Sequence, residues 1–197
     1  TANIDETPIR AECVAIGETN GRILERQAFW NAYQDNGNRT DYSHAFRGIG
    51  WTNATYDPLY TFDALNTNKI IDATSMYYGS KITGRIEVDT SGCTAMDSIF
   101  AYSAFSSIGT VDTRNIGNIG GTFTGATNLT NIDLLHLKKD GSQTFSNAVF
   151  FNCINLTEIR IKGRIGKSVN MQLCKNLSKD SIKNTEQTGI IDVLIDT

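Results

Sequence analysis

The sequence repeats itself every 23 residues across its central part, and this period constrains the fold more than any other feature. The segments 66–77, 89–100 and 112–123 align without gaps, and an aromatic residue closes each copy. The aligned sets are Thr67, Thr90 and Thr113; Ile70, Cys93 and Ile116; Ala73, Met96 and Ile119; and Tyr77, Phe100 and Phe123. Such self-similarity is typical of a solenoid, in which each repeat buries its apolar face against the next.

A second pattern follows the closing aromatic in the segments 123–134 and 150–161. It places a leucine at +6 and an isoleucine at +9, then a further aliphatic residue at +11. The pairs that we expect to alternate on a short strand are Ile132 with Leu134 and Ile159 with Ile161. The closing aromatics are 23, 23 and then 27 residues apart, ending at Phe150. We assign the additional four residues to a surface excursion within 137–144.

An asparagine precedes each leucine of this pattern, at Asn128, Asn155 and Asn176. Stacked asparagine amides can bond turn backbone groups that would otherwise lack a partner. Sequons at 53–55, 128–130 and 155–157 offer glycosylation as an alternative. For Asn128 and Asn155 we favour the turn role.

Composition restricts the class of protein. With 197 residues, 40% hydrophobic and 20% charged, the chain suits one repeat array with caps. The net charge of −3 and the lack of a Lys/Arg cluster argue against a nucleic-acid footprint or an anionic-membrane patch. No apolar run approaches the ~18 residues that span a bilayer, so we expect no membrane insertion. Thr1 opens directly onto polar sequence, so no signal peptide is visible in this chain.

The four cysteines form no CxxC pair, and the two histidines, His44 and His136, lie far apart in the sequence. We therefore expect no metal site and no cofactor. Cys153 and Cys174 fall at the same repeat position. We interpret them as small buried residues of the stack, and a disulfide between neighbouring rungs is the alternative.

We divide the chain into an N-terminal segment and cap (1–65), the array (66–177) and a C-terminal cap (178–197). The first part predicts an edge hairpin around Asn20-Gly21, a helix over 25–34 and an aromatic covering segment over 35–65. The same aromatics, Trp51 and Tyr56 among them, would alternatively form a binding surface. For the C-terminal cap we expect a helix from Ser178 to Gly189 and a strand over 190–196.

The segments "DTSGCTAMDSIF", "FTGATNLTNIDL" and "FFNCINLTEIRI" resemble the bacterial surface leucine-rich repeats of the BspA type, over roughly residues 25–185. The N-terminal "AFWNAYQDNGNRTDYSHAF" looks like a variant found in bacterial and prophage proteins, often beside tail or surface genes. Early copies depart from the pattern, since Ser103 and Ala126 stand where Cys153 has its thiol. The resemblance implies an α/β solenoid of four to six rungs with one curved, short-stranded parallel sheet. It also implies a non-catalytic, surface-displayed binding or adhesion module.

The usual catalytic motifs are missing, namely G-x-S-x-G, the P-loop, G-x-G-x-x-G after a strand and H-E-x-x-H. We interpret "GNIGG" (117–121) as close turn packing. Asp89 and Asp112 are related by the repeat, so turn capping is favoured over paired acid–base chemistry. We therefore expect no catalytic residues. A glycan-cleaving β-helix enzyme remains the less favoured alternative.

The function we predict is recognition of a protein or glycan at a bacterial or phage surface, outside the cell or on the virion. The candidate ligand-binding residues are Thr130, Glu158, Arg160, Lys162, Trp51 and Tyr56. The first four flank the strand residues at polar positions, and array proteins bind through such extended faces. A structural phage tail or virion component is the competing interpretation.

Overall fold

The computed structural model describes residues 40–43, 47–48, 70–145, 148–164, 169–171, 173–184 and 193–194. All of these belong to one compact unit, formed by Arg39–Tyr56 and Thr67–Thr197. The predicted hairpin around Asn20-Gly21, the helix over 25–34 and most of the segment 35–65, including Trp51 and Tyr56, lie outside the described residues. Across the described ranges, no helix has both the length and the apolar character needed to cross a membrane.

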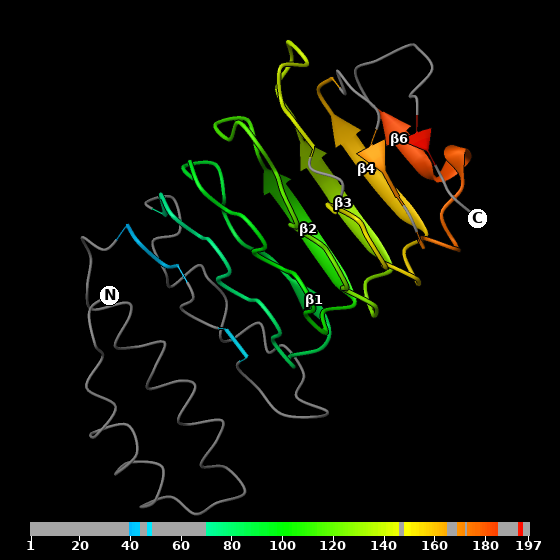
Figure 1. Ribbon diagram of the computed structural model, residues 1–197, viewed down its shortest axis with the longest axis horizontal. Coiled ribbons are helices and arrows are strands. Elements are labelled where there is room, and N and C mark those ends of the chain that lie inside the picture. The colour runs from blue at the N-terminus through cyan, green and yellow to red at the C-terminus, as the bar shows by residue number, and fades with distance from the viewer. Residues whose placement is uncertain are drawn as a thin grey trace, which may run out of the picture. The chain divides into compact units, whose positions relative to one another are not determined.

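The central element is a five-stranded parallel sheet in which each strand comes from a successive repeat (Figure 1). Its strands, in spatial order, are β1 (Arg85–Ile86), β2 (Ser107–Asp112), β3 (Asn131–His136), β4 (Glu158–Lys162) and β6 (Ile182–Asn184). One isoleucine of each strand pairs with that of the next: Ile86, Ile108, Ile132, Ile159 and Ile182. The described chain is therefore a β-solenoid of about four turns, which confirms the predicted solenoid architecture.

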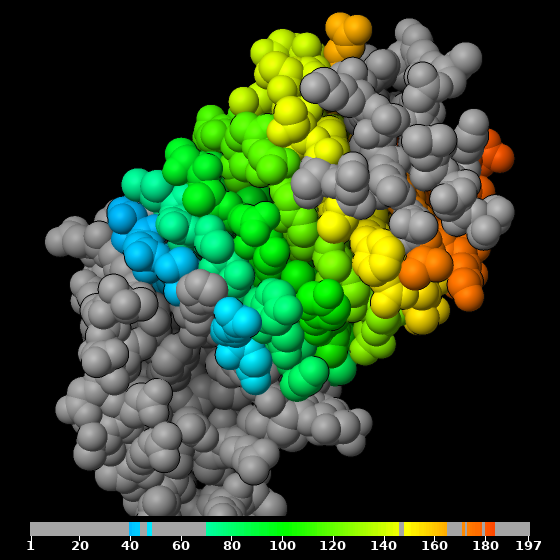
Figure 2. All heavy atoms as spheres, in the orientation of Figure 1, coloured from blue at the N-terminus to red at the C-terminus, as the bar shows by residue number. Residues whose placement is uncertain are grey.

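Successive repeats also lie side by side at the surface, where their colours follow one another in bands (Figure 2). Stacking begins before the expected start of the array, because Asp41 forms a parallel bridge with Asp72. Asp72 in turn bridges to Ala95, one repeat further on. A second parallel sheet, which the sequence did not predict, joins β5 (Val169–Asn170) to β7 (Val193–Leu194).

A β-bulge changes which residues of β3 face inward, so the strand pattern differs from the predicted one. β2 and β3 each contain one more residue between their inward-facing side chains than β4 does. The inward pairs are Ile108 and Val111 in β2, Ile132 and Leu135 in β3, and Ile159 and Ile161 in β4. The register accordingly shifts between β3 and β4. Leu135 is buried where we expected Leu134, so that prediction is wrong. Because β2 and β3 both contain the additional residue, the register between these two strands stays the same along their length.

The closing aromatics of the repeats form a continuous stack inside the solenoid. Tyr77 lies on Phe100, Phe100 on Phe123 and Phe123 on Phe150, with centroid distances of 5.9, 5.9 and 5.2 Å. Their rings are nearly parallel, and at most 1% of each residue is exposed. Each such pair contributes ~0.5–1.5 kcal/mol beyond its area burial. The 23-residue period thus reflects an aromatic column that ties the rungs together.

The cysteines of the array lie in the core as free thiols. Cys93, Cys153 and Cys174 are all fully buried, which confirms the interpretation as small core residues. The Cys153 thiol donates to the carbonyl of Phe123, one rung earlier, and the Cys174 thiol donates to that of Phe150. Burial raises the pKa of Cys93 to about 12. The adjacent Cys174 thiol, together with burial, raises the pKa of Cys153.

The asparagines of the turns hold neighbouring rungs together, as predicted. Asn155 Nδ2 donates to the carbonyl of Thr127 at 2.8 Å, and Asn176 Nδ2 to that of Ile154 at 3.0 Å. Asn128 makes the equivalent bond to Ala104 at 3.4 Å. The asparagines are exposed, so they satisfy carbonyls at the surface of the stack.

The predicted C-terminal helix is wrong over its described part. Lys179–Ser181 forms a single 3-10 turn, labelled η3, and β6 begins immediately after it at Ile182. Ile182 is 7% exposed and pairs with Ile159 of β4. Pairing and burial on the open edge of the sheet therefore outweigh the local helix signals at Ser178 and Asp180. The strand expected over 190–196 is present at Val193–Leu194 as β7.

Candidate recognition surface

Three of the predicted binding residues lie together on the exposed side of the parallel sheet, which we call the strand face. Glu158, Arg160 and Lys162 alternate along β4 with the buried Ile159 and Ile161. They therefore point outward, as the alternation predicted. Trp51 and Tyr56 lie outside the described residues.

Thr130, just before β3, connects neighbouring rungs by hydrogen bonds. Its hydroxyl donates to the carbonyl of Ser106 in the preceding rung at 2.8 Å. The carbonyl of Thr130 in turn accepts from the Thr157 hydroxyl at 3.0 Å. Both threonines are exposed, yet their hydroxyls bridge rungs. Thr130 thus supports the edge of the strand face.

Ion pairs on the strand face connect several strands. Arg85 of β1 pairs with the adjacent Glu87 and, at 2.6 Å, with Asp133 of β3. At the other end of the sheet, Glu158 pairs with Arg160 at 2.9 Å and with Lys183 of β6 at 3.1 Å. Charges of opposite sign therefore alternate across the face.

Gly109 allows the ion pair between Arg85 and Asp133 to reach across β2. It lies in β2, between β1 and β3, and a Cβ at this position would overlap the carboxylate of Glu87. Without a side chain on β2, the Glu87 and Arg85 side chains can extend over that strand toward β3. A glycine in a strand interior often marks such a close approach.

These pairs lower the pKa of two carboxylates of the strand face, Asp133 and Glu158. The hydrogen bond from Arg85 lowers the pKa of Asp133, and its charge and that of Arg160 act in the same direction. Hydrogen bonds from Lys183 and then Arg160 lower the pKa of Glu158. Asp133 and Glu158 are therefore each held in the ionised form by partners of opposite charge.

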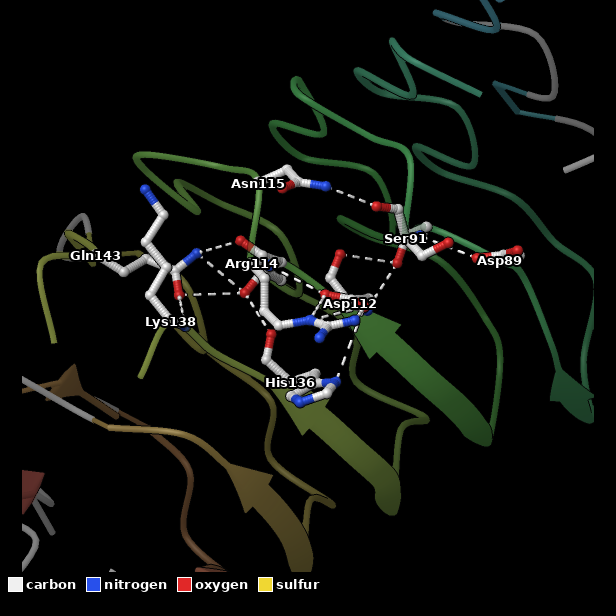
Figure 3. A network of polar contacts seen from close by, with 10 residues as sticks. Asp89, Ser91, Asp112, Arg114, Asn115, His136, Lys138 and Gln143 are labelled. Carbon is white, nitrogen blue, oxygen red and sulfur yellow. Dashed lines mark hydrogen bonds and ion pairs between the residues drawn. The ribbon is translucent and has the colours of Figure 1, made fainter. Parts of the chain in front are cut away.

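A more buried cluster lies at the carboxyl ends of β2 and β3 (Figure 3). The Asp112 side chain is 9% exposed, and Arg114 binds both of its oxygens, with Nε–Oδ1 and Nη2–Oδ2 distances of 3.0 and 2.5 Å. His136 Nδ1 lies 3.8 Å from Oδ2 of Asp112. Burial alone would raise the pKa of Asp112, but the hydrogen bonds and charge of Arg114 outweigh it and lower that pKa.

Asp89 and Asp112 both cap turns, as we favoured from the sequence. Asp89 Oδ1 accepts from the backbone N–H of Ser91 at 2.9 Å. Asp112 Oδ1 accepts from that of Arg114 at 3.1 Å. Figure 3 shows the two aspartates in successive turns. Within the described residues, no group of three or more His, Cys, Asp or Glu side chains could hold a metal ion.

Gln143 is a structural residue that sequence reasoning missed. It lies in the predicted excursion, whose residues Lys139, Asp140 and Ser142 are exposed, yet only 1% of Gln143 is exposed. Its Nε2 donates to the carbonyls of Thr113 at 2.7 Å and Ile116 at 3.0 Å. Its Oε1 accepts from the Thr113 hydroxyl at 3.2 Å. A glutamine within "KKDGSQT" gives no sequence signal for this burial.

The chain matches no protein-family model, and searches of curated proteins and of solved structures likewise return no match.

Proposed function

We propose that this chain is a non-enzymatic recognition module whose strand face binds a protein or glycan at a bacterial or phage surface. In this proposal the repeats are leucine-rich repeats of the BspA type. The buried Leu129, Leu156 and Leu177, each preceded by a stacking asparagine, support that assignment. The location that we propose is extracellular, on a cell surface or a virion.

The observation that carries the proposal is the ion-paired array on the strand face. Long charged side chains lose conformational entropy when a partner orders them. Here Arg85, Arg160 and Glu158 are already held by neighbours in the unbound chain. Binding to such a preorganised surface carries a smaller entropic penalty than binding to a mobile one.

The sign of the charges favours a polar, uncharged or mixed-charge partner. The six residues of the network are three cations and three anions, so their formal charges cancel. They are Arg85, Arg160, Lys183, Glu87, Asp133 and Glu158. Such a surface offers alternating donors and acceptors rather than one strong field. Protein surfaces and glycans match it better than a polyanion does.

Binding is tested on a printed glycan panel and on immobilised bacterial cell-wall polysaccharide, with reducing-sugar release read from the same wells. The test variant is Glu158→Ala/Arg160→Ala/Lys162→Ala. The matched control is Lys139→Ala/Asp140→Ala, which removes exposed charges from the excursion outside the strand face. We expect saturable binding that the triple variant loses and the control retains.

Other outcomes contradict the proposal. Binding that the triple variant retains would exclude the strand face. Release of reducing ends would indicate the glycan-cleaving alternative. A protein that binds neither panel and forms stable homo-oligomers would favour the structural tail or virion component.

A further inference from the structure

One turn of each described rung has a left-handed residue at the same position. It lies two residues after Phe46, after each closing aromatic from Tyr77 to Phe150, and after Met171. The residues at this position are Gly48, Gly79, Tyr102, Gly125, Asn152 and Leu173, with φ between 56 and 67°. The backbone N–H groups of the first four residues link neighbouring rungs, as when Tyr102 N donates to the carbonyl of Thr124 at 2.7 Å. Glycine and asparagine adopt this conformation readily, whereas a tyrosine or leucine is strained. The fold therefore requires the conformation but not the tyrosine.

Tyr102 is unusual in exposure as well as in backbone conformation. It is 51% exposed, the largest value among the four exposed large hydrophobic residues of the described chain. Two of the others, Phe151 and Leu173, belong to the same turn in later rungs. Backbone strain that is kept at an exposed residue points to a use for its side chain. Exposed apolar side chains thus recur at this turn of the rungs.

The neighbours of Tyr102 hold its ring in a defined position. The ring lies against Gly125, where a Cβ would lie 2.5 Å from the tyrosine Cδ1. It also contacts the ring of Tyr78, with a centroid distance of 5.3 Å and a tilt of 57°. Arg47 lies over the Tyr78 ring, with its Cζ 4.5 Å from the centroid. Three successive rungs thus contribute Arg47, Tyr78 and Tyr102 to one surface.

We propose that this surface, the Tyr78–Tyr102 platform, binds a pyranose unit of a glycan. The apolar C–H face of the sugar would lie on the exposed ring of Tyr102, next to the tilted ring of Tyr78. Tyrosine combines a large apolar area with a polar handle and little entropy to lose. The phenol hydroxyls and the Arg47 guanidinium supply hydrogen-bonding groups for the sugar hydroxyls. The platform lies on turns and is separate from the strand face.

The left-handed position provides a test in which loss of binding cannot be attributed to unfolding. Tyr102→Asn and Tyr102→Gly place there the residue types that Asn152 and Gly125 provide in other rungs. Both variants remove the ring and relieve the backbone strain, so we expect the urea midpoint to stay at or above that of the parent. Leu173→Asn is the matched control, because it relieves the same strain outside the platform. Tyr102→Phe keeps the ring face.

The probes are cellohexaose, chitohexaose and xylohexaose, titrated against the full chain by NMR. We expect at least one to bind, with affinity reduced about tenfold in Tyr102→Asn and Tyr102→Gly, which is the upper range for one aromatic contact. Leu173→Asn and Tyr102→Phe should bind like the parent.

Three results would overturn this inference. One is that no probe binds, and another is that Tyr102→Asn binds as tightly as the parent. The third is a concentration-dependent dimer in sedimentation that Tyr102→Asn abolishes, which would assign the platform to a second copy of the chain. If Glu158→Ala/Arg160→Ala/Lys162→Ala lost the sugar while Tyr102→Asn kept it, the strand face would be the glycan site.

Discussion

The aromatic column and the strand face arise from the same repeat but have opposite physical characters. Inside, Tyr77, Phe100, Phe123 and Phe150 stack in full burial. Outside, Arg85 and Asp133 pair across a glycine, and the side chain of each is more than 40% exposed. Burial of aromatic area contributes several kcal/mol per residue, whereas exposed ion pairs contribute little. The comparison indicates that the column maintains the fold, so the strand face is available for the recognition role that we propose.

The largest effect is expected from breaking the aromatic column at its centre. Phe123→Ala removes the ring that contacts both Phe100 and Phe150. We expect a loss of ~3–5 kcal/mol in the free energy of unfolding, measured by urea denaturation, because a cavity replaces two stacked contacts. Phe151→Ala is the control, since Phe151 is 37% exposed. Equal losses in the two variants would contradict the role of the column.

A smaller effect is expected from the buried glutamine of the excursion. Gln143→Ala leaves the carbonyls of Thr113 and Ile116 without the donor that they share. Loss of a buried partner typically costs ~1–3 kcal/mol in the free energy of unfolding. The exposed neighbour Ser142→Ala should cost less. If both variants unfold at the same urea concentration, Gln143 does not fasten the excursion to the stack.

The cluster of Asp112, Arg114 and His136 should make the stability of the fold depend on pH. The pKa of Asp112 is lower in the folded chain than in the unfolded one, mainly because Arg114 outweighs the effect of burial. The stabilisation is therefore complete above the ordinary aspartate pKa of about 4 and is lost as the pH falls through the lowered value. At pH 7 we expect the free energy of unfolding of Asp112→Asn to be ~1–2 kcal/mol lower than that of the parent.

This difference should shrink as the pH is lowered below 4, and paired urea titrations of the two proteins at several pH values measure it. Asp89→Asn is the control, because Asp89 caps an equivalent turn but is exposed. A difference that is independent of pH would show that Asp112 acts through packing rather than through its charge.

The parts of the fold that could be predicted are those that recur at fixed spacing. Phe100 and Phe123 align in the sequence because they occupy the same place in successive rungs, and the same holds for Asn128 and Asn155. The β-bulge between β3 and β4 could not be predicted. Leu134 and Leu135 are both apolar, so nothing in the sequence shows that the bulge turns Leu135 inward.

Local signals also failed where a distant partner decided the structure. Ser178 and Asp180 resemble a helix start, but Ile182 joins the sheet beside Ile159, which lies 23 residues earlier. Of the candidate sites, the outward row on β4 follows from alternation. The Tyr78–Tyr102 platform does not, because the left-handed backbone at Tyr102 becomes visible only in the structure. The only sign of the platform in the sequence is that Tyr102 aligns with Gly79 and Gly125.

One paired measurement tests most directly whether the interior holds the fold while the strand face serves recognition. Binding to the glycan and cell-wall panel and the urea midpoint are recorded together for the parent, for Phe123→Leu and for Glu158→Ala/Arg160→Ala/Lys162→Ala. We expect Phe123→Leu to lower the urea midpoint and retain binding while folded, whereas the triple variant should keep the midpoint and lose binding. A triple variant that unfolds early but still binds when folded would contradict this expectation.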